Sequence, residues 1–192
     1  MKKPLLIIGG SSFGSLSRIL AEECGHQVAG FVDDFHTGPD VLGRMDDLGS
    51  RLAAADFGLV MAIGYKHLPF RFDLFRRLVE AGFDFPRLLH PSARISAHAE
   101  IGAGCMVMAS ADIDAFSRLG DACVVWPHAT ISHDNDIGAN TFISPAATLC
   151  GFVSVGHSSF IGANSTLVNG ASLPANSFVK AATRHHGTTG RQ

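Results

Sequence analysis

The sequence has few cysteines, no run of basic residues and no long apolar segment, and each absence excludes a class of protein. The four cysteines, Cys24, Cys105, Cys123 and Cys150, show no CxxC or zinc-finger spacing, so we expect small buried side chains. A formal net charge of −2 without a Lys or Arg cluster argues against nucleic acid or an anionic membrane as partner. No segment approaches the roughly 20 apolar residues that span a bilayer.

The first residues, MKKPLLIIGGSSFG, do not resemble a targeting signal. Two lysines precede only four consecutive aliphatic residues before the chain turns glycine-rich, and a secretory signal needs a longer apolar core and a cleavage site. We therefore expect a cytoplasmic protein. Its 192 residues allow one large or two small domains.

An unbroken six-residue repeat occupies the second half of the chain. From Leu89 to Arg184 the sequence divides into sixteen hexads, each beginning with Leu, Ile or Val. The fifth position is small almost throughout, and Asn135 is the clear exception. A period of six fits neither an amphipathic helix nor strand alternation. We predict short strands with one interior aliphatic each, joined by corners where the small fifth residue lets the chain turn.

A second and longer period, of three hexads, lies inside the first. Glycine follows the aliphatic residue at Gly102, Gly120, Gly138 and Gly156. Three hexads therefore make one coil of a triangular prism, and successive coils should stack at the usual strand spacing of about 4.8 Å.

The first 86 residues lack the repeat and alternate between strand and helix patterns. We predict strands at Leu5–Ile8, Val28–Val32 and near 59–63, and helices over about 15–24 and 70–80. This alternation favours a small parallel sheet.

Ligands of such sheets bind at the carboxyl ends of the strands. The candidate substrate-binding residues at those ends are Gly10, Ser11, Ser12, Asp33, Asp34 and Gly64. The turn GGSSFG matches neither GxGxxG nor a Walker A loop, so a tight turn that needs a positive φ is the alternative interpretation. The carboxylate pair favours a nucleotide, because an acid there can accept hydrogen bonds from a ribose or a base.

These features together resemble the hexapeptide-repeat sugar O- and N-acyltransferases, of the sialic acid O-acetyltransferase and UDP-4-amino-sugar N-acetyltransferase type. The matching segments are the glycine turn, FVDDF at 31–35, AIG at 62–64, LLHPSA at 88–93, the hexads and SHD at 132–134. The resemblance implies a Rossmann-like nucleotide-sugar-binding domain over 1–86, a left-handed parallel β-helix over 87–184 and a polar tail over 185–192. It also implies a homotrimer, with acetyl-CoA as co-substrate and no metal. We expect outer walls rich in Ala, Val and Phe, which such an assembly would cover.

The hexad ISHDND carries the candidate chemistry. Acyl transfer to an amine or hydroxyl needs a base and a donor for the developing oxyanion. We expect His133 to be the base, with Asp134 orienting its imidazole. Gly151 has the same position three hexads later, so it should stack on His133, and its N–H matches the oxyanion donor of the resembling family. The function implied is acetylation of a nucleotide-linked 4-amino-deoxysugar, or alternatively of a sugar hydroxyl.

Some positions that match the family's coenzyme contacts differ from its usual residues. The matching positions are Phe142, Gly151, Ala163 and Ala181, and ordinary wall or corner packing is the alternative for each. Phe142 replaces a histidine that contacts the coenzyme in related enzymes. Phe13 and Tyr65 stand where the family often has histidine and asparagine, and the chain's last residues lack its usual proline-containing turn.

Two rival functions use the same prism. The γ-type carbonic anhydrases hold zinc between subunits, and His128 and His133 have the spacing of two of its ligands, but a catalytic zinc needs three. The third ligand's place is occupied by Ser92, and His90 and His98 are out of phase with the repeat. The other rival is a β-helix that binds a sugar nucleotide without catalysis.

Overall fold

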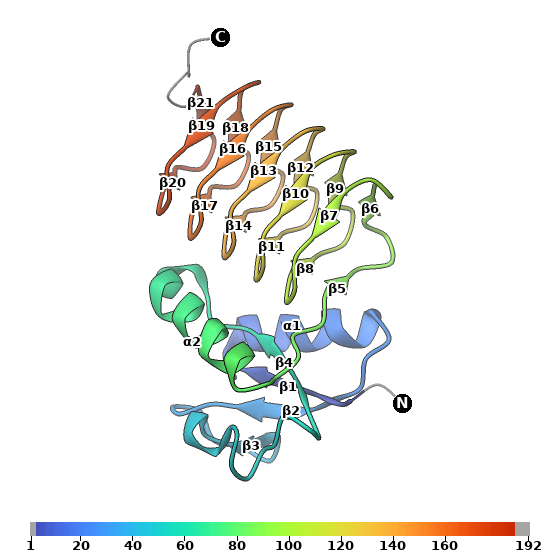
Figure 1. Ribbon diagram of the computed structural model, residues 1–192, viewed down its shortest axis with the longest axis vertical. Coiled ribbons are helices and arrows are strands. Elements are labelled where there is room, and N and C mark those ends of the chain that lie inside the picture. Colours follow the sequence, from blue (N-terminus) through green and yellow to red (C-terminus); the bar gives the residue numbers. More distant parts are fainter. Residues whose placement is uncertain (1–2, 187–192) are drawn as a thin grey trace. The chain divides into compact units, whose positions relative to one another are not determined.

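The computed structural model describes residues 3–186, and the chain divides into two compact units between Leu88 and Leu89. The first unit contains a four-stranded parallel sheet in the order β3-β2-β1-β4 (Figure 1). Its strands are β1 (Leu5–Ile8), β2 (Val28–Val32), β3 (Val41–Gly43) and β4 (Gly58–Met61). Its helices are α1 (Ser12–Glu23) and α2 (Leu68–Glu80), with the short 3₁₀ helices η1 (Met45–Asp47) and η2 (Tyr65–His67).

Helix α1 begins three residues before the predicted start because the glycine turn leads directly into it. A Cβ on Gly14 would clash with the Gly9 carbonyl oxygen, so only glycine lets the first turn of α1 pack this close to the end of β1. Gly9 itself has a φ of +106°, which confirms the need for a positive φ in this turn. Strand β3 was not predicted, since three residues carry too little pattern.

The second unit is a parallel β-solenoid of about five coils, which confirms the interpretation of the repeat (Figure 1). Two-residue strands recur once per hexad from β5 (Leu88–Leu89) to β21 (Arg184–His185). The strands between them start at residues 94, 100, 106, 112, 118, 124, 130, 136, 142, 148, 154, 160, 166, 172 and 178. They form three sheets in which each strand pairs with the strand three hexads away, for example β12 (Thr130–Ile131) with β15 (Thr148–Leu149).

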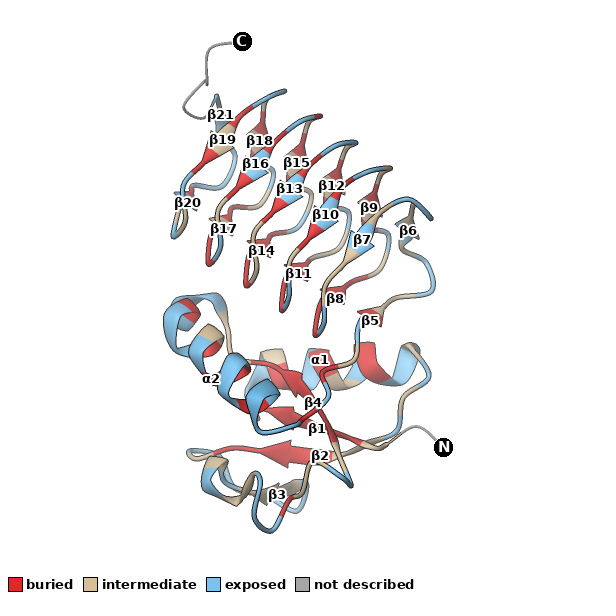
Figure 2. Ribbon diagram, in the orientation of Figure 1, coloured by how far each residue is buried: buried red, intermediate tan, exposed pale blue. Residues whose placement is uncertain are grey.

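The interior of the solenoid is a column of aliphatic side chains from the first hexad position. Ile113, Ile131, Ile143 and Leu149 have no exposed surface. In β10 (Arg118–Leu119), β13 (Asp136–Ile137) and β16 (Ser154–Val155) one residue is exposed and the next is buried (Figure 2). Adjacent side chains in a strand point to opposite faces, so each strand contributes one side chain to the core and one to the outer wall.

The corners turn at the fourth hexad position and not at the fifth, so the expected role of the small residue was wrong. From Gly104 to Ala182 the fourth residue of each hexad has a positive φ, between 54° and 72°. The fifth residue instead points inward, as with Cys105, Cys123 and Ala129, which are completely buried. It is small because three corners converge on a narrow interior.

The cysteines differ in their surroundings. Cys105 and Cys123 are buried fifth-position residues of stacked coils, whereas Cys24 and Cys150 are only half-buried. A hydrogen bond with Cys123, together with burial, raises the pKa of the Cys105 thiol well above its ordinary value. Since the thiolate is the reactive form, Cys105 acts as an inert core residue.

The outer walls are less apolar than we expected from the repeat. Glu100, Arg118, Asp136 and Ser154 stand exposed on one sheet. A second sheet presents Thr130, Thr148 and Thr166. The expectation of walls rich in Ala, Val and Phe is therefore wrong for two of the three sheets.

Replacing Ile131 with alanine should lower the free energy of unfolding by about 2–5 kcal/mol, because the side chain is completely buried in the continuous core and truncation leaves a cavity. Thr130→Ala, in the same strand but facing outward, should change it by less than about 1 kcal/mol. Urea unfolding followed by circular dichroism measures both. Equal losses would contradict this assignment of the two faces.

Candidate active site

His133 and Asp134 lie at the corner between β12 and β13, where the chain turns from one sheet to the next. Asp134 occupies the turning position, with a φ of 56°. The His133 Nδ1 is 2.8 Å from the Asp134 Oδ2, and both side chains are partly exposed, at 46% and 39%. A carboxylate on Nδ1 favours the tautomer with its proton there, which leaves Nε2 as a proton acceptor.

Gly151 lies against the His133 ring, one coil further on. A Cβ at Gly151 would lie 2.6 Å from the His133 Cε1 and 2.8 Å from Nε2, so any side chain there would displace the imidazole. The Gly151 N–H donates no hydrogen bond to any of the described residues, although the Gly151 carbonyl accepts one from the Gly170 N–H at 2.9 Å. This corner thus places a proton acceptor beside an available backbone donor.

Two exposed phenylalanines border the same corner. Phe116 and Phe152 stand one coil before and one coil after Asp134, at the turning position, with φ values of 63° and 58°. They are 61% and 57% exposed, and the Phe152 ring meets the His133 ring edge-on at a centroid distance of 5.2 Å. A bulky residue with positive φ is strained, and its exposure to water adds to the cost, so packing does not explain this choice.

The positions matched to coenzyme contacts lie elsewhere on the solenoid. Phe142 is in β14 (Phe142–Ile143) and is buried, with 1% exposed. Ala163 and Ala181 occupy equivalent places one coil apart, after β17 (Phe160–Ile161) and β20 (Phe178–Val179). They belong to a different corner column from His133 and Gly151.

The two histidines with zinc-like spacing stand at different corners. His128 is the turning residue before β12, with a φ of 60°, whereas His133 follows that strand. No group of three or more His, Cys, Asp or Glu side chains suited to a metal occurs among residues 3–186.

The first unit has a cavity of about 420 Å³ at the carboxyl ends of β1, β2 and β4. Of the candidate residues, Ser11, Asp33, Asp34 and Gly64 line it. Gly10 lies beside it through its bond to Asp33, and Ser12 is exposed at the start of α1. The lining residues that were not among the candidates from the sequence are Gly9, Phe35, Met45, Ala62, Ile63, His67 and Phe70. Phe35 directly follows the carboxylate pair at the end of β2, and this position could have identified it as a lining residue. Met45 belongs to η1, which was not predicted.

Asp33 holds the glycine turn, and both of its carboxylate oxygens already accept hydrogen bonds from the protein. It is 7% exposed, and its Oδ2 accepts a hydrogen bond from the Gly10 N–H at 2.5 Å and lies 3.1 Å from the His36 Nδ1. Its Oδ1 accepts from the N–H groups of Phe35 at 2.7 Å and His36 at 2.8 Å. Burial alone would raise the pKa of this carboxyl, but the hydrogen bonds from Gly10, His36 and Phe35 outweigh it and lower the pKa to about 2.

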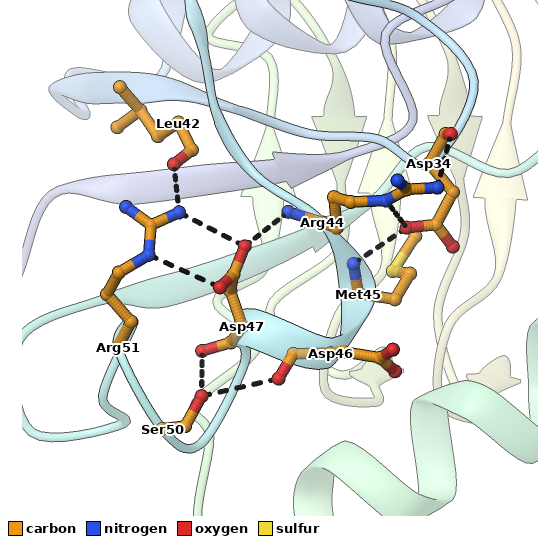
Figure 3. Close-up of polar contacts among 8 residues, drawn as sticks. All are labelled: Asp34, Leu42, Arg44, Met45, Asp46, Asp47, Ser50 and Arg51. Carbon is orange, nitrogen blue, oxygen red and sulfur yellow. Dashed lines mark hydrogen bonds and ion pairs between the residues drawn. The ribbon is translucent and has the colours of Figure 1, made fainter.

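Asp34, in contrast, faces a polar network around η1 (Figure 3). Its Oδ1 accepts from the Met45 N–H at 2.9 Å and lies 3.7 Å from the Arg44 Nε. Beside it, Asp47 binds Arg51 and the Arg44 N–H, and these contacts lower the pKa of Asp47. The network holds the loop after β3 beside the cavity. The Asp34 Oδ2 accepts no hydrogen bond from residues 3–186.

Asp33 should make stability depend on pH in the acid range. Because its folded pKa of about 2 lies below the ordinary 3.8, its contribution is complete above pH 4 and is lost as the pH falls toward 2. The free energy of unfolding of the wild type should exceed that of Asp33→Asn by about 2 kcal/mol at neutral pH, with the difference shrinking between pH 4 and 2. Urea titrations at several pH values measure this, and a difference independent of pH would contradict it.

Comparison with known proteins identifies the family. The chain matches no protein-family model and no curated protein significantly. Among solved structures, the acetyltransferase domain of PglB from Neisseria gonorrhoeae superposes with a TM-score of 0.92 at 29% identity, covering 97% of this chain and 92% of that one. PerB from Caulobacter crescentus, in complex with CoA and GDP-perosamine, superposes with a TM-score of 0.89 at 30% identity, covering 97% and 90%.

These similarities extend over both units and nearly the full length of each neighbour. They argue against the carbonic anhydrase and non-catalytic interpretations, because both neighbours are acetyltransferases. The Caulobacter enzyme is a GDP-perosamine N-acetyltransferase. With its hexad solenoid and the His133 corner, the chain belongs to the hexapeptide-repeat sugar N-acetyltransferases.

Proposed function

We propose that this protein transfers the acetyl group of acetyl-CoA to the amino group of a nucleotide-linked 4-amino-deoxysugar. The observation that carries the proposal is the direct stacking of Gly151 on the exposed His133 ring, whose Nδ1 is bound by Asp134. The neighbour PerB holds CoA and GDP-perosamine, which supports a nucleotide-linked amino sugar as the acceptor class.

The geometry supports direct transfer from acetyl-CoA to the amine, without an acylated enzyme, with His133 as general base. As the sugar amine attacks the thioester carbonyl carbon, the His133 Nε2 accepts the proton that the amine loses. The Gly151 N–H donates a hydrogen bond to the oxygen that becomes negative in the tetrahedral intermediate. The carbon–sulfur bond then breaks, CoA leaves as its thiol with the proton from His133, and the amide remains. Asp134 stabilises the transient imidazolium.

The cavity of the first unit is proposed to hold the nucleotide, in a Rossmann-like domain over residues 1–86. Asp34 has an oxygen available for a ribose or base, whereas Asp33 acts indirectly by fixing the Gly10 turn. Phe35 is 92% exposed and lines the cavity, so it can stack on a base. Gly10, Ser11 and Ser12 lie where α1 begins, a position that favours phosphate, and Gly64 also lines the cavity.

We propose that the solenoid is left-handed, spans residues 87–184 and binds acetyl-CoA through Gly151, Ala163 and Ala181, with Phe142 as a buried wall residue. A homotrimer is the proposed assembly. The strained and exposed Phe116 and Phe152 beside His133 support it, because a neighbouring subunit or a substrate would cover their apolar surface. Neither helix within residues 3–186 has the length and apolar character that crossing a bilayer requires.

His133→Ala should reduce kcat by a factor of about 10² to 10⁴, the usual effect of losing a general base. Gly151→Ala should reduce it about 10²-fold, since the new methyl group displaces the ring. CoA release by thiol titration, against UDP-, dTDP- and GDP-linked 4-amino-sugars and their 4-hydroxy counterparts, measures both.

His128→Ala is the matched control, because it removes another exposed histidine one corner away and should leave kcat unchanged. Transfer that survives His133→Ala would overturn the role of the base. Transfer only to the 4-hydroxy sugars would replace the amine with a hydroxyl as the acceptor.

Phe35→Ala should raise KM for the nucleotide sugar about tenfold, given roughly 1–3 kcal/mol for base–aromatic stacking, and leave KM for acetyl-CoA unchanged. Leu16→Ala, at a half-exposed apolar position on α1, controls for general surface effects. Initial rates with each substrate varied in turn measure both constants, and an unchanged sugar KM would argue that the base does not stack on Phe35.

A further inference from the structure

Asn135, the residue that breaks the pattern of small fifth positions, is directed into the corner behind His133. It is only 2% exposed. A buried amide needs partners for its donors and its acceptor, so its contacts identify what it does at this corner.

The Asn135 side chain connects the coil of His133 to the coil of Gly151. Its Nδ2 donates to the Ser132 carbonyl at 2.6 Å, and its Oδ1 accepts from the Val153 N–H at 2.8 Å. Ser132 directly precedes His133, and Val153 is two residues after Gly151. The Asn135 amide therefore binds the backbone close to both His133, the proposed base, and Gly151, the proposed oxyanion donor.

A hydroxyl completes the connection on the preceding coil. The Ser117 Oγ donates to the same Ser132 carbonyl at 2.5 Å and accepts from the Asn135 N–H at 3.1 Å. The carbonyl before His133 thus receives two hydrogen bonds from side chains inside the solenoid.

Two other corners of the same column are closed by a hydrogen bond within their own hexad. The fifth-position N–H donates to the second-position carbonyl of its own hexad, from Ala99 to Ser96 at 3.0 Å and from Ala171 to Val168 at 3.0 Å. At the two corners of the candidate site this N–H is diverted to the previous coil, from Asn135 to Ser117 and from Val153 to Asn135. The backbone shape of both corners therefore depends on the Asn135 side chain and its partner.

We propose that Asn135 is a positioning residue for acetyl transfer, which fixes the His133 ring relative to the Gly151 N–H through bonds to Ser132 and Val153. The inference rests on the proposed function, because that function makes His133 the base and the Gly151 N–H the oxyanion donor. The two residues are in such close contact that little movement between them is possible, and a displacement of about 1 Å can reduce the rate 10²-fold.

The test compares Asn135→Ala with Ser159→Ala in the purified full-length protein. Ser159 makes the same kind of connection at another corner column: its Oγ donates to the Gly156 carbonyl at 2.7 Å and accepts from the Ser177 N–H at 3.1 Å. Both variants lose an internal link between coils, so their melting temperatures should fall by similar amounts. Only Asn135→Ala should lower kcat, by at least tenfold, with KM for both substrates within about threefold of wild type.

Asn135→Ser is the second variant and guards against a failure of Asn135→Ala to fold. A serine at the fifth position can both donate within its corner and accept from the next coil, as Ser159 does, so it should recover most of the lost kcat. A kcat within twofold of wild type in folded Asn135→Ala, or an equal loss in Ser159→Ala, would overturn the inference. If Asn135→Ala does not fold, a kcat for Asn135→Ser no higher than that of His133→Ala would overturn it as well.

The proposed function fails separately. It fails if the wild type transfers no acetyl group, or if His133→Ala keeps full activity. If the wild type transfers acetyl groups, His133→Ala loses this activity and Asn135→Ala keeps it, the proposed function stands and only the positioning role of Asn135 is contradicted.

Discussion

The parallel pairing of each strand with the strand three hexads away is the constraint on which the solenoid depends. Bonds such as Thr130 N–H to the Ala147 carbonyl and Ser132 N–H to the Leu149 carbonyl, at 2.8 and 2.9 Å, hold each coil on the next. Because the period allows no slippage, residues that share a hexad position in successive coils meet at one corner. His133 and Gly151 face each other for that reason, and an insertion between them would move them to different corners.

The candidate active site uses this regular scaffold with a few local substitutions. The corner accepts an imidazole at His133 because the residue at the same position one coil further on, Gly151, has no side chain. The interior of the corner accepts a large amide because Asn135 replaces the ordinary turn bond with bonds to neighbouring coils. Phe116 and Phe152 place exposed aromatic rings at turning positions, where the repeat requires only a positive φ. These departures from the repeat therefore cluster at the candidate active site.

Much of this arrangement could be predicted because the repeat is strict. Ile131 in the core and the stacking of Gly151 on His133 follow from the period alone. The first unit was harder: β1 and β2 were located correctly, but β3 and η1 were missed since short edge elements have little pattern of their own. The two acidic residues after β2 looked equivalent, yet Asp33 is held by Gly10 and His36, whereas Asp34 faces the cavity. Such a difference depends on neighbours distant in sequence.

The sequence by itself determined the coil length, the inward aliphatic column and the alignment of Gly151 with His133 one coil earlier, because a six-residue period without insertions permits one register. Only the tertiary structure decided that the chain turns at the fourth hexad position, that the Asn135 side chain points inward to join Ser132 to Val153, and that Phe35 borders the cavity. These features depend on backbone angles and on contacts between coils or loops, which arise only once the chain has folded.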